Sequence, residues 1–147
     1  MVDRVGVERI GEHVQRCTAS LLGRLQELGD RVVVYGPRDL TARGGTIAFN
    51  LRQGTRIVDY ELVERAARER GIAIRGGCFC NPGAAEHAFQ IDAARARSCL
   101  KGPFTVSRFR SCLGHGAVGA LRASVGLATS EEDLDRLAAL LAEFRSR

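Results

Sequence analysis

Two cysteines stand close together in a glycine-rich segment, which reads Arg-Gly-Gly-Cys-Phe-Cys-Asn-Pro-Gly over residues 75–83. Glycines allow sharp turns of the backbone, so Cys78 and Cys80 are expected on an exposed loop. A nearby guanidinium, such as that of Arg75, favours the thiolate, which is the nucleophilic form of cysteine. The segment therefore predicts a reactive thiol.

The chain has five cysteines and no apolar export signal at its start. An odd number of cysteines without such a signal argues against a disulfide framework, so reduced thiols are expected. Cys17 lies on an apolar helical stripe and is expected to be a small buried side chain. Cys99 and Cys112 fall in an irregular stretch, residues 76–118, where long loops are usually functional or mobile.

A metal-binding module is a second interpretation of the same stretch. Its Cys-x-Cys spacing is tighter than that of usual zinc sites, and its ligand pairs are irregular, so it ranks below the reactive thiol. Two histidines of the stretch could also act as bases toward the thiol, although a loop histidine is more often merely solvated. The candidate ligands are Cys78, Cys80, His87, Cys99, Cys112 and His115.

The apolar periodicity predicts helix, strand, strand, helix, strand, long loop, strand and helix, in that order. Such an order indicates one α+β domain over residues 1–147, a small sheet with helices packed on it. The second helix is expected to turn Val58, Leu62, Val63 and Ala66 inward. The expected ranges are helix 4–28, strand 32–35, strand 46–51, helix 54–70, strand 72–75, a short helix near 84–94, strand 119–126 and a helix beginning near 130.

Composition limits the partners that are expected. The net charge is +5, and Lys101 is the only lysine among 22 basic residues. Acidic residues stand among the arginines, as in Glu64-Arg65 and Glu69-Arg70, so a nucleic-acid partner is not expected. No segment has the length of uncharged apolar residues that a membrane span needs, and a cytoplasmic protein is the default.

The cysteine segment resembles the active-cysteine segment of molybdenum cofactor sulfurases and their bacterial class V relatives. Gly-Ile-Ala-Ile-Arg at 71–75 looks like the matching part of cysteine desulfurases, and 45–51, 121–127 and 131–137 resemble that family in the same order. The chain is thus similar to the small C-terminal domain of a class V aminotransferase/cysteine desulfurase protein, closest to the molybdenum cofactor sulfurase-like branch. The resemblance implies the fold of fold-type I pyridoxal-phosphate enzymes, with a short and mostly antiparallel sheet.

The resemblance also implies a chemistry. In such enzymes a substrate cysteine bound to pyridoxal phosphate gives its sulfur to a protein thiolate, which becomes a persulfide and passes the sulfur to an acceptor. By its place in the motif, Cys80 corresponds to the persulfide-forming nucleophile, with Cys78 as a substitute or resolving neighbour. Arg122 corresponds to the arginine that binds the substrate carboxylate, and Arg75 to an arginine near the cofactor. Asn50 corresponds to a structural asparagine.

The family holds its cofactor on a lysine of a large domain, and this chain contains no matching lysine. Lys101 lies in the irregular stretch and is interpreted as a surface residue. The chain alone is therefore expected to bind no pyridoxal phosphate and to need a large domain in cis or in trans. A fragment, a split enzyme and an inactive remnant all fit the sequence, as does a sulfur-carrier or interaction domain without a cofactor.

Overall fold

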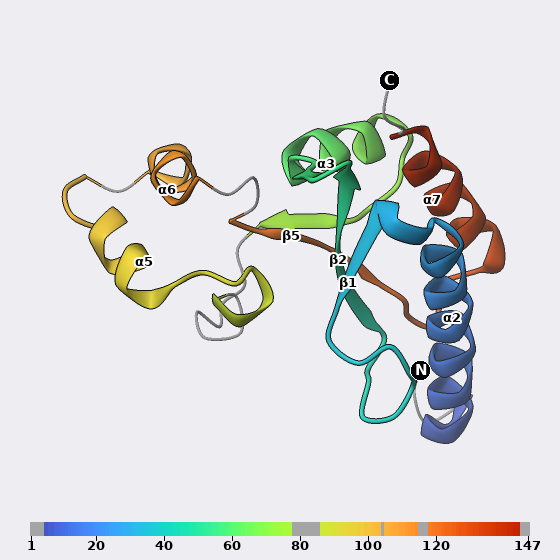
Figure 1. Cartoon of the computed structure of the whole chain (residues 1–147). Helices are drawn as coiled ribbons and strands as arrows, with labels where there is room; N and C mark the ends of the chain where they lie inside the picture. The colour runs from blue at the N-terminus through green and yellow to red at the C-terminus, as the bar shows by residue number, and fades with distance from the viewer. Residues whose placement is uncertain (1–4, 78–85, 104, 115–117, 145–147) are drawn as a thin grey trace.

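The fold is known from a computed structural model, which describes residues 5–77, 86–103, 105–114 and 118–144 (Figure 1). A long helix is followed by three consecutive strands, a second helix and a fourth strand, and short helices precede the last strand. The elements are α2 (Val7–Glu27), the 3₁₀ turn η1 (Gly29–Arg31), β1 (Val32–Tyr35), β2 (Thr46–Gln53), β3 (Arg56–Ile57), α3 (Tyr60–Glu69), β4 (Arg75–Gly77), α5 (Ala93–Cys99), α6 (Val106–Leu113), β5 (Ala120–Ser124) and α7 (Glu131–Glu143).

The strands form one antiparallel sheet in the order β1-β2-β5-β4, and β3 pairs with the end of β2. The central strand β2 pairs with β5, which follows it in the chain by about seventy residues (Thr46 lies opposite Ser124). The expected fold class, a small antiparallel sheet with helices packed on it, is confirmed.

One face of this sheet carries the main core. Ile47, Phe49 and Leu51 alternate along β2 and are almost fully buried, as is Leu121 on β5. They pack against the apolar stripes of α2 and α7, which lie side by side on this face (Figure 1), and against α3. Because side chains alternate along a strand, the other residues of β2 and β5 point to the opposite face.

Several helix boundaries follow from caps that the sequence supplies. Ser130 accepts from the backbone N–H of Asp133, whose carboxylate in turn accepts from the N–H of Ser130, so the two residues form a capping box at the start of α7. Asp59 caps α3 by accepting from the N–H of Glu61 at 3.1 Å. These side chains satisfy N–H groups that the first turn of a helix leaves unpaired.

The sequence-based prediction places the start of the second helix too early. Residues 54–57 instead form a tight turn and the strand β3, because Gly54 takes a positive φ of 60° and reverses the chain onto β2. Leu62, expected inward, is 50% exposed, whereas Val63 is fully buried. The third strand likewise covers Arg75–Gly77 rather than residues 72–75.

Two short helices, α5 and α6, occupy part of the stretch expected to be mostly irregular. They lie on the side of the sheet opposite to α2 and α7 (Figure 1). Cys99, Leu113 and Val118 form a small second core there, with Ile91 and Phe109 packed against it. Of the short helix expected near residues 84–94, residues 86–88 are helical and residues 84–85 lie outside the described part of the chain, while α5 at Ala93–Cys99 is a further helix that the sequence did not predict.

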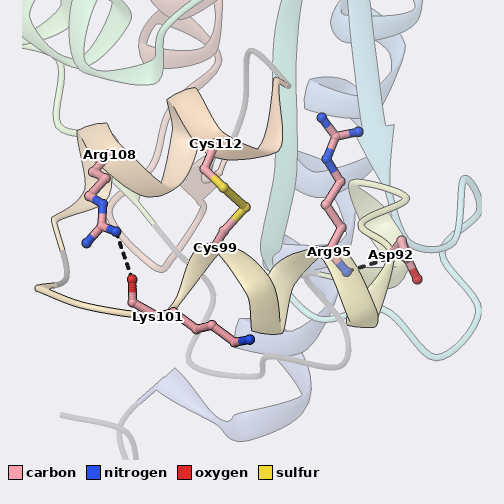
Figure 2. The surroundings of a disulfide bond; sticks show 6 residues. All are labelled: Asp92, Arg95, Cys99, Lys101, Arg108 and Cys112. Atoms are coloured by element: carbon pink, nitrogen blue, oxygen red, sulfur yellow. Dashed lines mark hydrogen bonds between the residues drawn. A yellow bond between two sulfur atoms is a disulfide. The ribbon is translucent and has the colours of Figure 1, made fainter.

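A disulfide between Cys99 of α5 and Cys112 of α6 joins these two helices (Figure 2). The expectation of reduced thiols is therefore wrong for this pair, since the α5–α6 turn brings two cysteines that are thirteen residues apart into bonding distance. Cys17 is free and buried, as predicted. Among the described helices, none is long and apolar enough to cross a bilayer.

The disulfide is expected to hold the α5–α6 pair closed, because the second core is small. We expect Cys112→Ser to lower the free energy of unfolding by about 3 kcal/mol or less, because that is the value expected when a disulfide closes a loop of this size in the unfolded chain. We expect trypsin to cut after Lys101 or Arg108 at least about tenfold faster in this variant, as local opening becomes more frequent. Mass spectrometry of timed digests measures this.

Cys80→Ser serves as the matched control, since it removes a thiol and leaves the disulfide intact. Equal cutting rates in Cys112→Ser, Cys80→Ser and the parent chain would contradict a stabilising role for the bond.

Candidate functional site

The two cysteines of the predicted reactive loop, Cys78 and Cys80, lie outside the described residues. In the sequence they follow Gly77, the last residue of β4. The assignment of the nucleophile to either thiol therefore stays a prediction. What the structure describes is the end of the strand from which the cysteine segment continues, and the side chains around that strand end.

This strand end is a crowded junction. A side chain at Gly76 would overlap the ring of Tyr60, and one at Gly119 would lie 2.7 Å from the same ring and from the Gly77 carbonyl. Glycine is thus required at both positions by close packing rather than by flexibility. The ring of Tyr60, the first residue of α3, fixes the end of β4 against the start of β5.

Arg75 and Arg122 lie directly opposite each other on the paired strands β4 and β5. Because they are cross-strand partners, their side chains share the sheet face that points away from the main core. Arg75 is exposed, and Arg122 is partly buried, with an Nε atom that has no hydrogen-bond partner in the described part of the chain. Two like charges in this position repel each other, and a bound anion would relieve that repulsion.

An ion pair joins α6 to the same junction. Arg110 donates from Nη1 and Nη2 to Oδ2 and Oδ1 of Asp59, at 2.5 and 3.1 Å. The paired guanidinium lowers the pKa of the Asp59 carboxyl below its ordinary value, and this carboxylate raises the pKa of Arg110. The two side chains are 27% and 26% exposed, so water only partly screens the attraction.

A hollow of about 630 Å³ separates α6 from the sheet. Tyr35 of β1, Arg56 of β3 and Phe89 line it, together with Arg110 and Ser111 of α6. The rings of Tyr35 and Phe89 meet edge to face, with centroids 5.4 Å apart. The hollow thus combines aromatic walls with two guanidinium groups at its border.

Asn50 is fully buried on the face that carries Arg122. Its amide donates to the hydroxyl of Tyr35 at 3.1 Å and to the carbonyl of Gly119 at 3.0 Å. Burial raises the pKa of Tyr35 above its ordinary value, which keeps the phenol protonated. These bonds link β1, β2 and the start of β5, which accords with the structural role expected for Asn50.

The one lysine of the chain, Lys101, does not fit a pyridoxal-phosphate site. Lys101 is exposed in the turn between α5 and α6, as the sequence predicts for a surface lysine. The starts of α3, α5, α6 and α7, which could otherwise receive a phosphate, are capped by the chain's own side chains, whereas α2 starts at Gly6 without a side-chain cap. These capping residues are Asp59, Asp92, Thr105 and Ser130.

The zinc interpretation loses two of its candidate ligands. Cys99 and Cys112 are bonded to each other, and a disulfide sulfur is not the thiolate that zinc binds. His87 is exposed on the chain segment before α5, while His115 lies outside the described residues. Among the described residues, no group of three or more potential ligands is gathered.

Sequence reasoning missed three residues of the junction: Asp59, Tyr60 and Arg110. Asp59 carries a local signal, because an aspartate directly before an apolar helical pattern is typical of a helix N-cap. Arg110 carries none, since its partner is fifty-one residues away in the chain. The opposition of Arg75 and Arg122 depends on strand register, which no local pattern specifies.

Comparisons with known proteins agree over almost the whole chain. A family model described as aminotransferase class-V matches residues 1–137. The molybdenum cofactor sulfurase of Drosophila mojavensis is 32% identical over 148 residues, and that of Drosophila grimshawi 35% over 149. Each of these alignments covers 92% of this chain but 19% of the relative, so the chain spans about a fifth of the length of the curated relatives it matches.

A solved structure shares the fold. The apo cysteine desulfurase from Thermococcus onnurineus NA1 superposes with a TM-score of 0.62 at 22% sequence identity. The match covers 97% of this chain and 27% of that enzyme. At this identity the likeness establishes the arrangement of helices and strands and not the chemistry.

The ion pair between Asp59 and Arg110 is expected to contribute to stability separately from the helix cap. Asp59→Asn keeps an oxygen that can accept from the N–H of Glu61 but removes the charge, so we expect the free energy of unfolding to fall by about 1 kcal/mol. Asp59→Ala removes both interactions and is expected to cost about 2 kcal/mol. Urea unfolding at neutral pH measures both.

The pH dependence gives a second check on this pair. Since the pKa of Asp59 is lower in the folded chain than its ordinary 3.8, the pair contributes fully above that pH and is lost as pH falls through the lowered value. The difference between the parent chain and Asp59→Asn should therefore shrink in acid. A difference that stays constant down to strongly acidic pH would contradict the ion pair.

Proposed function

Because this chain belongs to the aminotransferase class-V family, we propose that it supplies the sulfur-accepting thiol and the substrate-carboxylate site of a cysteine desulfurase-like sulfurase. Cys80 is the persulfide-forming nucleophile, with Cys78 beside it. Arg122 binds the carboxylate of the substrate cysteine, and Arg75 extends the same positive site. The cross-strand opposition of the two arginines is the observation that carries this proposal.

The arginine pair suits a carboxylate for physical reasons. A guanidinium presents parallel N–H donors that match the two oxygens of a carboxylate, and a second cation strengthens the attraction. The Nε of Arg122 is buried without a partner among the described residues, so part of the donor set is available. Unpaired buried donors are costly, and a ligand oxygen would remove that cost.

The position of the pair relative to the cysteine segment also supports the proposal. Arg75 begins β4, and Cys78 and Cys80 follow that strand within five residues in the sequence. Cationic groups near a thiol favour its thiolate form. A substrate held by its carboxylate at the strand would thus have its sulfur near the chain segment that bears the thiols.

The cofactor of the family belongs to a part of the protein that this chain does not contain. Pyridoxal phosphate would weaken the bond between carbon and sulfur of the substrate when a large domain holds it. The residues of this chain bind the carboxylate and receive the sulfur. Activity is accordingly expected only with a large domain present, in cis or in trans.

Persulfide formation by the chain itself tests the thiol. The cysteine thiolate attacks the outer sulfur of glutathione persulfide. A new sulfur–sulfur bond to the cysteine forms, the sulfur–sulfur bond of glutathione persulfide breaks, and glutathione thiolate leaves, so no external oxidant is needed. We expect mass spectrometry of peptides to find one added sulfur on Cys80 in the parent chain and in Cys78→Ser. Cys80→Ser should lose it. Equal labelling of Cys80→Ser would remove Cys80 from the mechanism.

The carboxylate site is tested in the enzyme completed by its large domain. Arg122→Lys keeps the charge but loses the paired N–H donors. A hydrogen bond to a charged group contributes about 1.5–3 kcal/mol, so we expect kcat/KM for cysteine to fall roughly 10–100-fold. Arg52→Lys is the matched control, because Arg52 lies on β2 and its Nε donates instead to the carbonyl of Asp30. Similar losses in both variants would contradict a specific role for Arg122.

A further inference from the structure

The net charge of the chain is concentrated in one short segment. The whole chain has 22 basic and 17 acidic residues, a net charge of +5. Five of the basic residues and none of the acidic ones fall within residues 93–114. The rest of the chain therefore carries equal numbers of both kinds. We call residues 93–114, which comprise α5, α6 and their connection, the basic hairpin.

Most of the charges of the basic hairpin face solvent and form no described ion pair. Arg95, Arg97, Lys101 and Arg108 are all exposed, and none forms an ion pair with another described residue. The nearest acid in the sequence, Asp92, accepts hydrogen bonds from the backbone N–H groups of Ala94 and Arg95 as the cap of α5. Arg110 differs from the other four, since Asp59 neutralises it.

The backbone that carries these charges is held in place at three points. The Cys99–Cys112 disulfide joins α5 to α6, and the ion pair with Asp59 fixes α6 to the body. The guanidinium of Arg108 donates to the carbonyls of Lys101 at 2.7 Å and Pro103 at 2.6 Å, which links α6 to the residues that follow α5. Arg95, Lys101 and Arg108 surround the disulfide (Figure 2). A positive surface ordered in advance loses less entropy when a partner binds.

The surface between the charges suits a protein better than a nucleic acid. Leu100, next to Lys101, is 49% exposed, and apolar contact beside arginine is typical of protein interfaces. Single-strand-binding surfaces use exposed aromatic rings for stacking, whereas Phe109, the one aromatic residue among the described residues of the hairpin, packs against the small second core. The rest of the chain carries equal numbers of basic and acidic residues, so the excess positive charge of the sequence lies in the hairpin.

We propose that the basic hairpin is a docking site for an acidic surface of a partner protein. Arg97 and Lys101, at the end of α5, supply the main attraction, and Leu100 supplies apolar contact. The disulfide keeps α5 and α6 in the relative position that the partner meets. This proposal concerns the hairpin alone and does not depend on the chemistry of Cys80 or Arg122.

The experiment compares two double variants of equal net charge. Arg97→Glu/Lys101→Glu alters the hairpin, and Arg9→Glu/Arg16→Glu alters two exposed arginines of α2 that have no described ion pair. Binding of a short fluorescent polyglutamate peptide and of a fluorescent oligo-dT is measured by anisotropy at low and physiological salt. Circular dichroism checks folding. The neutral variant Arg97→Gln/Lys101→Gln serves if charge reversal disturbs α5.

We expect the parent chain to bind polyglutamate more tightly than oligo-dT. The hairpin variant should weaken polyglutamate binding by roughly tenfold or more, and the α2 variant by no more than about twofold. Equal weakening in both variants would show that total charge alone matters and would overturn the proposal. Preferred binding of oligo-dT by the hairpin would assign it to nucleic acid instead. Absence of polyglutamate binding by the parent chain would also overturn the proposal.

Discussion

The first turn of α3 is the point at which the separate parts of this molecule are joined. Asp59 caps the helix and binds Arg110 of α6, while the ring of Tyr60 occupies the space above Gly76 and Gly119. Two adjacent residues therefore fix the end of β4, the start of β5 and the placement of α6. The arginine pair and the cysteine segment both depend on that strand end for their position.

The sequence predicts those elements whose stability is visible in their own pattern. The helix with the apolar stripe, α2, and the strands β1 and β2 all appear close to their expected ranges. Elements held by distant contacts were missed or misplaced. The helices α5 and α6 are too short to be stable alone, and a disulfide and the Asp59–Arg110 pair stabilise them.

The candidate site shows the same division. The residue types in the cysteine segment and at Arg122 could be identified from the sequence, but the opposition of Arg75 and Arg122 required the strand register. The argument from an odd number of cysteines failed for Cys99 and Cys112, because it concerns a framework and not one local pair. Charge counted over the whole chain likewise concealed a positive segment, since the remaining residues balance each other.

The strands β4 and β5 are neighbours in the sheet, and Gly77 lies opposite Ala120. The last residue of β4 and the first residue of β5 are thus adjacent in the sheet, although forty-two residues separate them in the sequence. Closing a longer excursion costs only about 0.6 kcal/mol for each doubling of its length, so insertions or deletions there would leave the strand pairing intact. Changes of length in the cysteine segment and the basic hairpin can therefore adapt the domain to new partners, while the residues that pack the sheet against its helices stay the same.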